Sequence, residues 1–455
     1  MPQQDRSWMV PIEVMLGSLS HGEVQACSIS IVPDEIRKAG ENSFKPKVIS
    51  VGPLHRGTTR DLQLMEEPKW SYMNKFLQRN ENQVVGKTLQ DYGDDILGLV
   101  KKISASYGGT VQSEPNELAK IMIVDGCFLL NLLIRLGDSI TRNESSVDPE
   151  DPILENEEKV VSVLNDITML ENQVPFIVLK RLYKKVFKNS NDNEVANIVR
   201  KAFGYPEVNS SGGAHILHLM HLSTVQQNTQ HINKRADKEL KRCAARLIAA
   251  GVTIQPADDH GGCNNNLVNK FNFDINCTDS ELKIPVLRVK KTTEVRWRNL
   301  IAWEQSKIWV SCQYTSYAFF FQGLICCKHD IEILLAKGVI VNDSGKSIGE
   351  LWDLFLTISK GAERMNLRYE GICKDLNKYR GRKVRTVLQE KPIVTWHKCR
   401  RVSDNMVYYG KKSYRSLISD HIPTIWKLIG VLAAALLLVL TIMQTYYAAH
   451  SSGKG

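Results

Sequence analysis

Several features that would assign this 455-residue chain to a familiar class are missing from it. Its 10 cysteines form no regular C-x-x-C framework, and in a cytosolic domain most of them should be reduced thiols. Residues 1–25 contain an early acid and two prolines but no apolar core of the signal-peptide type. No internal repeat and no long low-complexity tract occurs. We therefore expect one large or two closely packed globular domains after an N-terminal extension at 1–25.

An excess of positive charge is also missing from most of the chain, although the net charge is +10. Residues 360–427 hold 17 Lys and Arg against 6 Asp and Glu, whereas the rest of the chain carries 42 basic and 43 acidic residues. This distribution argues against a generally basic, nucleic-acid-binding surface. DNA binding through 360–415 would have the charge but no recognised motif. We predict instead a basic juxtamembrane neck at 360–427 that faces anionic lipid, and no nucleic-acid partner.

Charge of either sign is absent from residues 428–449, a run of 22 residues. A helix of that length can cross a hydrocarbon core of roughly 30 Å. We predict a transmembrane helix at 425–447 and a short tail at 448–455. Four Lys or Arg lie within 411–427, whereas only Lys454 follows the span. This bias predicts a single-pass protein of the plasma membrane with the bulk of the chain in the cytoplasm.

The apolar pattern of the remaining chain is mostly that of helices, so the predicted fold class is mainly α. Residues 117–137 are apolar on most faces, as in a central buried helix. Further helices are expected at 61–80 (interrupted by Pro68), 154–170, 176–187, 296–336 and after Ser347, where Ser347 and Glu350 have capping-box spacing. Alternating residues predict a small β element near 271–295. Polar loops are expected at 204–214 and 256–269, within one helical domain at 26–415.

Ordered motifs run through most of the chain. They include VISVGPLHRG at 48–57, DITMLENQVPFIVLKRLY at 166–183, RNLIAWEQS at 298–306 and DIEILLAKGVIVND at 330–343. In these motifs the chain resembles the plant family called domain of unknown function 247, or uncharacterised protein family 0481. The resemblance implies a mostly helical domain with a C-terminal plasma-membrane anchor and no established enzyme activity. Some relatives are encoded at grass self-incompatibility loci, so cell recognition is a role that the family can take.

The loop at 48–57 raises the question of catalysis, because His55 could form a general acid–base pair with Glu66. No recognised motif places a nucleophile beside them. A structural interpretation is that Gly52 and Pro53 form a turn whose backbone is hydrogen-bonded by His55 and Arg56. We favour this structural joint and predict no catalytic residues.

Metal binding was considered for two groups of residues. His215, His218 and His221 share one helical face but lack the usual i, i+4 spacing and a nearby acid. Cys326, Cys327 and His329 are adjacent instead of ligand-spaced. We therefore predict no metal ligands, and no cofactor is indicated.

Polar residues lie among apolar neighbours around Glu171 and Glu304. Buried polar groups need partners, so we expect hydrogen-bond networks that fix helix junctions, and a functional site there stays an alternative.

The function expected from these features is that of an anchored interaction, recognition or signalling module without catalytic activity. Its protein partner is unknown, and no small-molecule substrate is indicated. Two alternatives stay open. One is an enzyme of unrecognised type, such as a hydrolase that uses His55 and a carboxylate. The other is an extracellular-facing self-recognition protein, as in the grass relatives.

Overall fold

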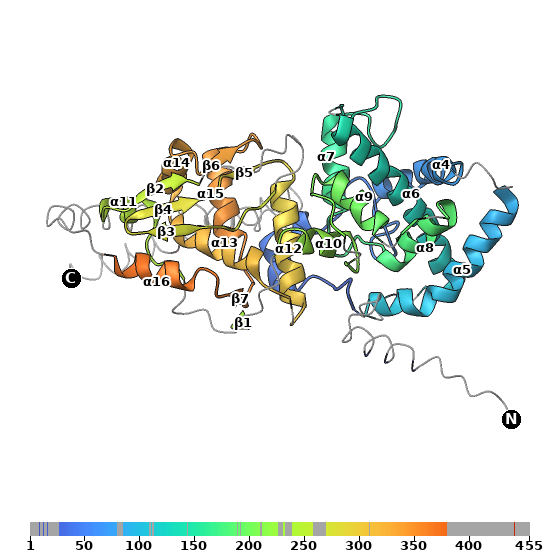
Figure 1. Ribbon diagram of the computed structural model, residues 1–455, viewed down its shortest axis with the longest axis horizontal. Coiled ribbons are helices and arrows are strands. Elements are labelled where there is room, and N and C mark those ends of the chain that lie inside the picture. The colour runs from blue at the N-terminus through green and yellow to red at the C-terminus, as the bar shows by residue number, and fades with distance from the viewer. Residues whose placement is uncertain are drawn as a thin grey trace. The chain divides into compact units, whose positions relative to one another are not determined.

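The structure is a computed structural model of the whole chain (Figure 1). It describes residues 27–379 with gaps at 80–84, 109–110, 112, 143, 189, 192, 210–211, 226–230, 233–238, 258–269 and 309, together with positions 9, 12, 16 and 441. Residues 1–390 form one compact unit, and 391–455 form a second.

Helices make up most of the described chain, which confirms the mainly α prediction. They are α2 (Asp34–Ala39), α3 (Arg60–Leu64), α4 (Glu66–Leu77), α5 (Val85–Ser106), α6 (Pro115–Arg142), α7 (Glu157–Asp166), α8 (Phe176–Val186), α9 (Glu194–Ala202), α10 (Ile216–Leu222), α11 (Ala244–Ala249), α12 (Thr293–Ser306), α13 (Gln313–Leu324), α14 (Lys328–Ala336), α15 (Ile348–Thr357) and α16 (Glu370–Lys378). A short 3₁₀ helix, η2, spans Glu41–Ser43.

The central helix of the N-terminal half is α6, with α4, α5, α8 and α9 grouped around it (Figure 1). The predicted buried helix at 117–137 is thus confirmed, because nearly every residue from Leu118 to Leu133 is shielded from solvent. Gly126 lets α8 approach closely, since a Cβ there would lie 2.5 Å from Cδ1 of Leu182. This packing forms the main apolar core of the N-terminal half.

The strands form three small sheets. They are β1 (His231–Ile232), β2 (Thr253–Pro256), β3 (Asn276–Thr278), β4 (Glu281–Ile284), β5 (Leu287–Val289), β6 (Ile340–Asn342) and β7 (Met365–Asn366). The orders are β1–β7, β2–β4–β3 and β5–β6, with β2 and β4 parallel and β5 and β6 parallel. The predicted β element at 271–295 contains β3, β4 and β5. Their partners β2 and β6 lie outside it and were not expected.

One predicted helix is wrong in detail. The helix expected at 61–80 is broken at Met65, between α3 and α4, and not at Pro68. Pro68 lies in the first turn of α4, where a missing N–H costs little because that donor has no intrahelical acceptor. The capping box at Ser347 and Glu350 is confirmed at the start of α15.

The membrane-spanning part of the predicted fold class requires correction. Within the described residues, no helix combines the length and the apolar character needed to cross a bilayer. The long helices α5 and α6 carry charged side chains along their length. For the described residues the fold class is mainly helical with three small sheets, and the predicted transmembrane helix is not supported. Apart from Thr441, the segment 425–447 lies outside the described residues, as do the tail at 448–455, the neck from 380 onward and most of 1–25 and 256–269.

Candidate functional site: a buried polar junction

The backbone of the motif loop at 47–52 is held by a carboxylate at the end of α7. Asp166 accepts hydrogen bonds from the N–H groups of Lys47 at 3.0 Å, Val48 at 2.7 Å and Ile49 at 2.9 Å. Burial raises the pKa of Asp166 to about 6, and the three N–H donors oppose that rise because they favour the charged form. The loop is thus fixed to the end of a helix far along the chain.

Two amide side chains of the ENQVP motif continue this anchoring. Asn172 accepts from the N–H of Val51 at 2.7 Å and donates to the carbonyl of Ile49 at 3.0 Å, as a neighbouring strand would. Gln173 donates to the carbonyls of Ile167 and Met169, both at 2.8 Å, and so closes the turn after α7. The polar residues near Glu171 therefore complete a backbone network, as expected from the sequence.

Glycine is required at position 52 for two reasons. Its φ of +75° is a conformation that L side chains rarely adopt. A Cβ there would also lie 2.5 Å from the carbonyl oxygen of Gln173 and 2.8 Å from Oη of Tyr107. The Gly52 N–H donates to Asp125 at 2.8 Å. The chain passes through a space that admits only backbone.

A fully buried ammonium group lies beneath this turn. Nζ of Lys69 donates to the carbonyl of Ser50 at 2.5 Å, to Oε1 of Glu66 at 2.6 Å and to Oδ1 of Asp125 at 2.8 Å. All three of its N–H groups therefore have acceptors. Burial raises the pKa of Asp125, and Lys69 opposes that rise. This lysine compensates the charge that α6 would otherwise bury alone.

His55 faces Glu171 and not Glu66, so the structure does not contain the pair that the sequence offered as a catalytic alternative to the structural joint. Nε2 of His55 lies 3.2 Å from Oε2 of Glu171. Oε1 of Glu171 accepts from the N–H of Val32 at 2.7 Å and from the guanidinium of Arg37. Burial would raise the pKa of Glu171, but contacts with His55, Val32 and Arg37 outweigh it and leave the pKa below its ordinary value.

Arg56, and not His55, lies beside Glu66. Nη2 of Arg56 lies 2.5 Å from Oε2 of Glu66, and Nη1 lies 3.7 Å from Oδ2 of Asp125. The predicted role of His55 and Arg56, hydrogen bonding to the backbone of their own turn, is therefore wrong. Both pair with carboxylates outside their own turn, which the local sequence does not reveal. The loop is nevertheless fixed in place, because Asp166, Asn172 and Asp125 accept hydrogen bonds from its backbone.

Glu304 on α12 forms a second centre. It is fully buried and accepts from the N–H of Tyr314 at 2.9 Å, the N–H of Thr315 at 2.8 Å and Oγ1 of Thr315 at 2.6 Å. Its Oε1 also lies 3.0 Å from Nε2 of His221. Glu304 thus fixes the start of α13 and the end of α10 to α12.

The three histidines around α10 do not converge on one point. Nε2 of His215 lies 3.2 Å from the carbonyl of Ser28, Nδ1 of His218 accepts from the N–H of Ala214 at 3.0 Å, and His221 faces Glu304. Burial lowers the pKa of His215 to about 3 and that of His218 well below its ordinary value. These two rings are therefore neutral packing residues at neutral pH.

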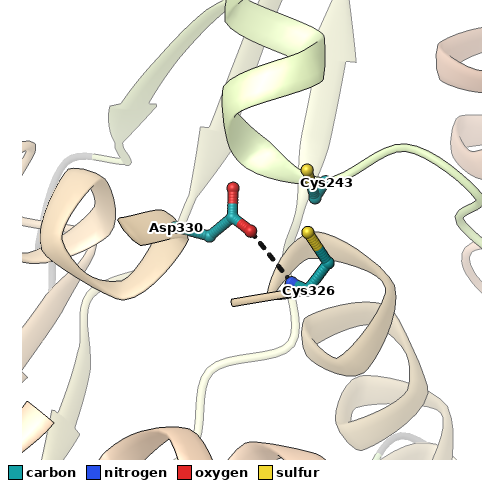
Figure 2. A group of neighbouring side chains, drawn as sticks. All are labelled: Cys243, Cys326 and Asp330. Atoms are coloured by element: carbon teal, nitrogen blue, oxygen red, sulfur yellow. Dashed lines mark hydrogen bonds between the residues drawn. The ribbon is translucent and has the colours of Figure 1, made fainter. Parts of the chain in front are cut away.

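The structure brings together a different group of metal-ligating side chains. The ligand atoms of Cys243, Cys326 and Asp330 all lie within 4.8 Å of one another (Figure 2). Of the neighbouring residues Cys326, Cys327 and His329, the histidine is not part of this group, because Nδ1 of His329 lies 3.2 Å from Oε2 of Glu332. The missing ligand, Cys243, is remote in sequence, so spacing alone gave no signal for it.

These elements define a mainly helical protein in which the polar residues of the sequence motifs form an internal hydrogen-bond network. The chain belongs to the plant family described as DUF247, plant protein of unknown function, whose family model matches residues 29–440. The UPF0481 protein At3g47200 of Arabidopsis thaliana is 26% identical over 366 residues, which cover 74% of this chain and 73% of that protein. A second Arabidopsis thaliana UPF0481 protein, At3g02645, is 25% identical over 211 residues, covering 45% of this chain and 32% of that protein. No solved structure matches significantly.

Proposed function

We propose that this chain is a protein-interaction module without catalytic activity of its own. The observation that carries the proposal is the use made of the motif residues. Asp166, Asn172, Asp125 and Lys69 all bind the backbone of the loop at 47–52, so the most distinctive side chains of the chain serve its internal order.

The arrangement around His55 agrees with this proposal. Its carboxylate partner, Glu171, is already engaged by Val32 and Arg37. Within the described ranges, no hydroxyl or thiol hydrogen-bonds the His55 ring. Among the described side chains, none is therefore placed on this ring as the nucleophile that covalent catalysis would require.

A face of α4 next to the loop has the composition of a contact surface. Trp70 is 48% exposed and lies one helical turn from Glu66, which holds the partly exposed Arg56. Tryptophan and arginine are enriched among residues that dominate binding energy at protein interfaces. We propose that a partner protein binds the surface formed by Arg56, Glu66 and Trp70.

Proximity labelling in the native plant tests this surface with Trp70→Ala against a matched control, Leu97→Ala on α5. Leu97 is 41% exposed, so its truncation removes a comparable apolar contact elsewhere. We expect W70A to lose a defined set of labelled neighbours that wild type and L97A retain, with thermal unfolding unchanged in both variants. Labelling by W70A that matches wild type contradicts the assigned surface.

The contact between His55 and Glu171 also supports one rival function, a hydrolase. A panel of chromogenic ester, amide and phosphate substrates separates the two. Turnover by wild type that disappears in a folded His55→Gln variant overturns the non-catalytic proposal.

The charge of residues 360–427 supports a second partner, an anionic lipid surface. Each Lys or Arg near such a surface contributes about 1 kcal/mol, and the attraction weakens with salt. We expect the chain to co-sediment with phosphatidylserine vesicles at low salt and to be released at high salt. Equal sedimentation with neutral phosphatidylcholine vesicles contradicts this proposal.

A further inference from the structure

Two thiols and a carboxylate meet where α11 adjoins the start of α14. Cys243 is the N-cap residue of α11, Cys326 lies two residues before α14, and Asp330 lies in the first turn of α14. Figure 2 shows the side chains of Cys243 and Cys326 next to each other, with the Asp330 carboxylate beside them. Cys243 and Asp330 are buried, and Cys326 is partly exposed.

The carboxylate is already held in position by backbone donors. Oδ1 of Asp330 accepts from the N–H of Ala245 at 3.0 Å, and Oδ2 accepts from the N–H groups of Cys326 at 2.9 Å and Cys327 at 3.2 Å. Such outer contacts orient the carboxylates that bind metals and are part of a working site. Asp330 therefore does not have to lose rotational freedom when it acts as a ligand.

We propose that Cys243, Cys326 and Asp330 form a binding site for Zn²⁺. Thiolate ligands select a soft or borderline cation over Mg²⁺ or Ca²⁺, and a carboxylate oxygen is an accepted third ligand of zinc. Two thiolates and one carboxylate carry three negative charges, which a divalent ion largely neutralises. The partly exposed position of Cys326 leaves room for water as the fourth ligand.

The donor atoms need only a small movement to close around the ion. In a tetrahedral site with Zn–S bonds of about 2.3 Å, the ligand atoms are roughly 3.3–3.8 Å apart. The present separations do not exceed 4.8 Å, so rotation of the two cysteine side chains brings them within reach. The Asp330 side chain, fixed by its three N–H donors, can stay where it is.

A bound ion would join two segments that are far apart in the chain. α11 precedes β2, whereas α14 precedes β6, and both helices pack against each other. Zinc would cross-link these elements in addition to their apolar packing. Ligands that bind only the native state raise its stability by mass action, so metal binding should be visible in the unfolding temperature.

Metal titration of the full chain, reduced with a phosphine, tests the site. We expect one Co²⁺ per chain with a near-ultraviolet sulfur-to-cobalt charge-transfer band, displacement of that ion by Zn²⁺, and a rise in the unfolding temperature with Zn²⁺. Cys326→Ser and Cys243→Ser should each weaken binding at least tenfold. The controls are C277S, matched to the partly exposed Cys326, and C373S, matched to the buried Cys243, and both should bind as wild type does.

Three results would overturn the zinc site. One is the absence of the charge-transfer band, and another is equal binding by C243S, C326S and the two controls. The third is a redox pair instead of a metal site: peroxide would take two electrons and two protons from Cys243 and Cys326 to form a disulfide, at the same rate with and without Zn²⁺. If a serine variant folds poorly, alkylation of the wild-type chain provides a second test. Zn²⁺ should protect both Cys243 and Cys326 from the alkylating reagent.

Discussion

Glu171 and Glu304 each accept hydrogen bonds that join separate segments of the chain, but only Glu171 contacts side chains that are partly exposed to solvent. Glu304 is fully buried, and its partners are two backbone N–H groups, a hydroxyl and a buried histidine. Glu171 instead contacts Arg37 and His55, whose side chains are 25% and 15% exposed. We call Glu304 and its buried partners the closed centre, and we assign it a structural role. We call Glu171 with Arg37 and His55 the open centre, because these two side chains are partly exposed and a binding partner can contact them.

The largest expected effect is that of replacing Lys69, the buried lysine beneath the turn at Gly52. Lys69→Met removes the nearer of the two cations that face Asp125 and keeps the length of the side chain, while Arg56 remains 3.7 Å away. Removing one partner of a buried ion pair costs about 3–5 kcal/mol, so urea unfolding should show a loss near the lower end of that range. Lys75→Met, at an exposed position of the same helix, is the control and should change the unfolding free energy little. A small effect of K69M would contradict the role of Lys69 as the main counter-charge of Asp125.

A direct comparison of the two carboxylates comes next. Glu304→Gln places its amide NH2 against either the Tyr314 N–H or the Thr315 N–H, because only one of the two oxygens is kept, and in this fully buried site it should cost about 2–3 kcal/mol. Glu171→Gln should cost about 1 kcal/mol, because Arg37 and His55 can be solvated. Equal losses in urea unfolding would remove the distinction between a closed and an open centre.

Substitutions at Gly52 and Gly57 distinguish the cost of steric crowding from the cost of backbone strain in the motif at 48–57. Gly52 and Gly57 have φ values of +75° and +69°, but a Cβ at Gly57 would meet only Nε2 of Gln63, at 3.8 Å. Gly57→Ala should therefore cost about 1 kcal/mol from strain alone. Gly52→Ala adds the contact with Gln173 and should cost about 2–3 kcal/mol in thermal unfolding. Equal costs would show that the loop is not tightly held at Gly52.

As the pH falls, the first loss of folding stability should come from the buried rings of His215 and His218. The folded-state pKa values of His215 and His218 lie below their unfolded value of 6.5, so their contribution is complete above pH 6.5 and is lost as the pH falls toward 3. The slope is about 1.4 kcal/mol per pH unit for each histidine. Glu171, whose pKa is also lowered, adds its loss only below pH 4.5. His215→Gln should flatten urea-unfolding stability between pH 6 and 4; an unchanged slope would contradict the buried, neutral ring.

Two local signals in the sequence were reliable, whereas the long-range pairings could not be predicted. The burial of α6 follows from its apolar pattern, and the Ser347 cap follows from spacing within one turn. The partner of His55 could not be read locally, because Glu171 and Glu66 are equally plausible carboxylates until the chain folds. Cys243 was missed for the same reason. The break at Met65 was misplaced because Pro68 carries the stronger helix-breaking signal, which is silent in a first turn.

The long reach of the loop contacts also has a consequence for synthesis of the chain. The N–H groups of residues 47–49 donate to Asp166, which follows them by 117 to 119 residues in the sequence. The carbonyl of Ser43 accepts from Asn299, which follows it by 256 residues. At roughly 5–20 residues per second, the ribosome delivers these partners many seconds after the loop has emerged. The first part of the chain therefore leaves the ribosome without its final hydrogen bonds. Its motif becomes ordered only when translation has supplied the remainder of the fold.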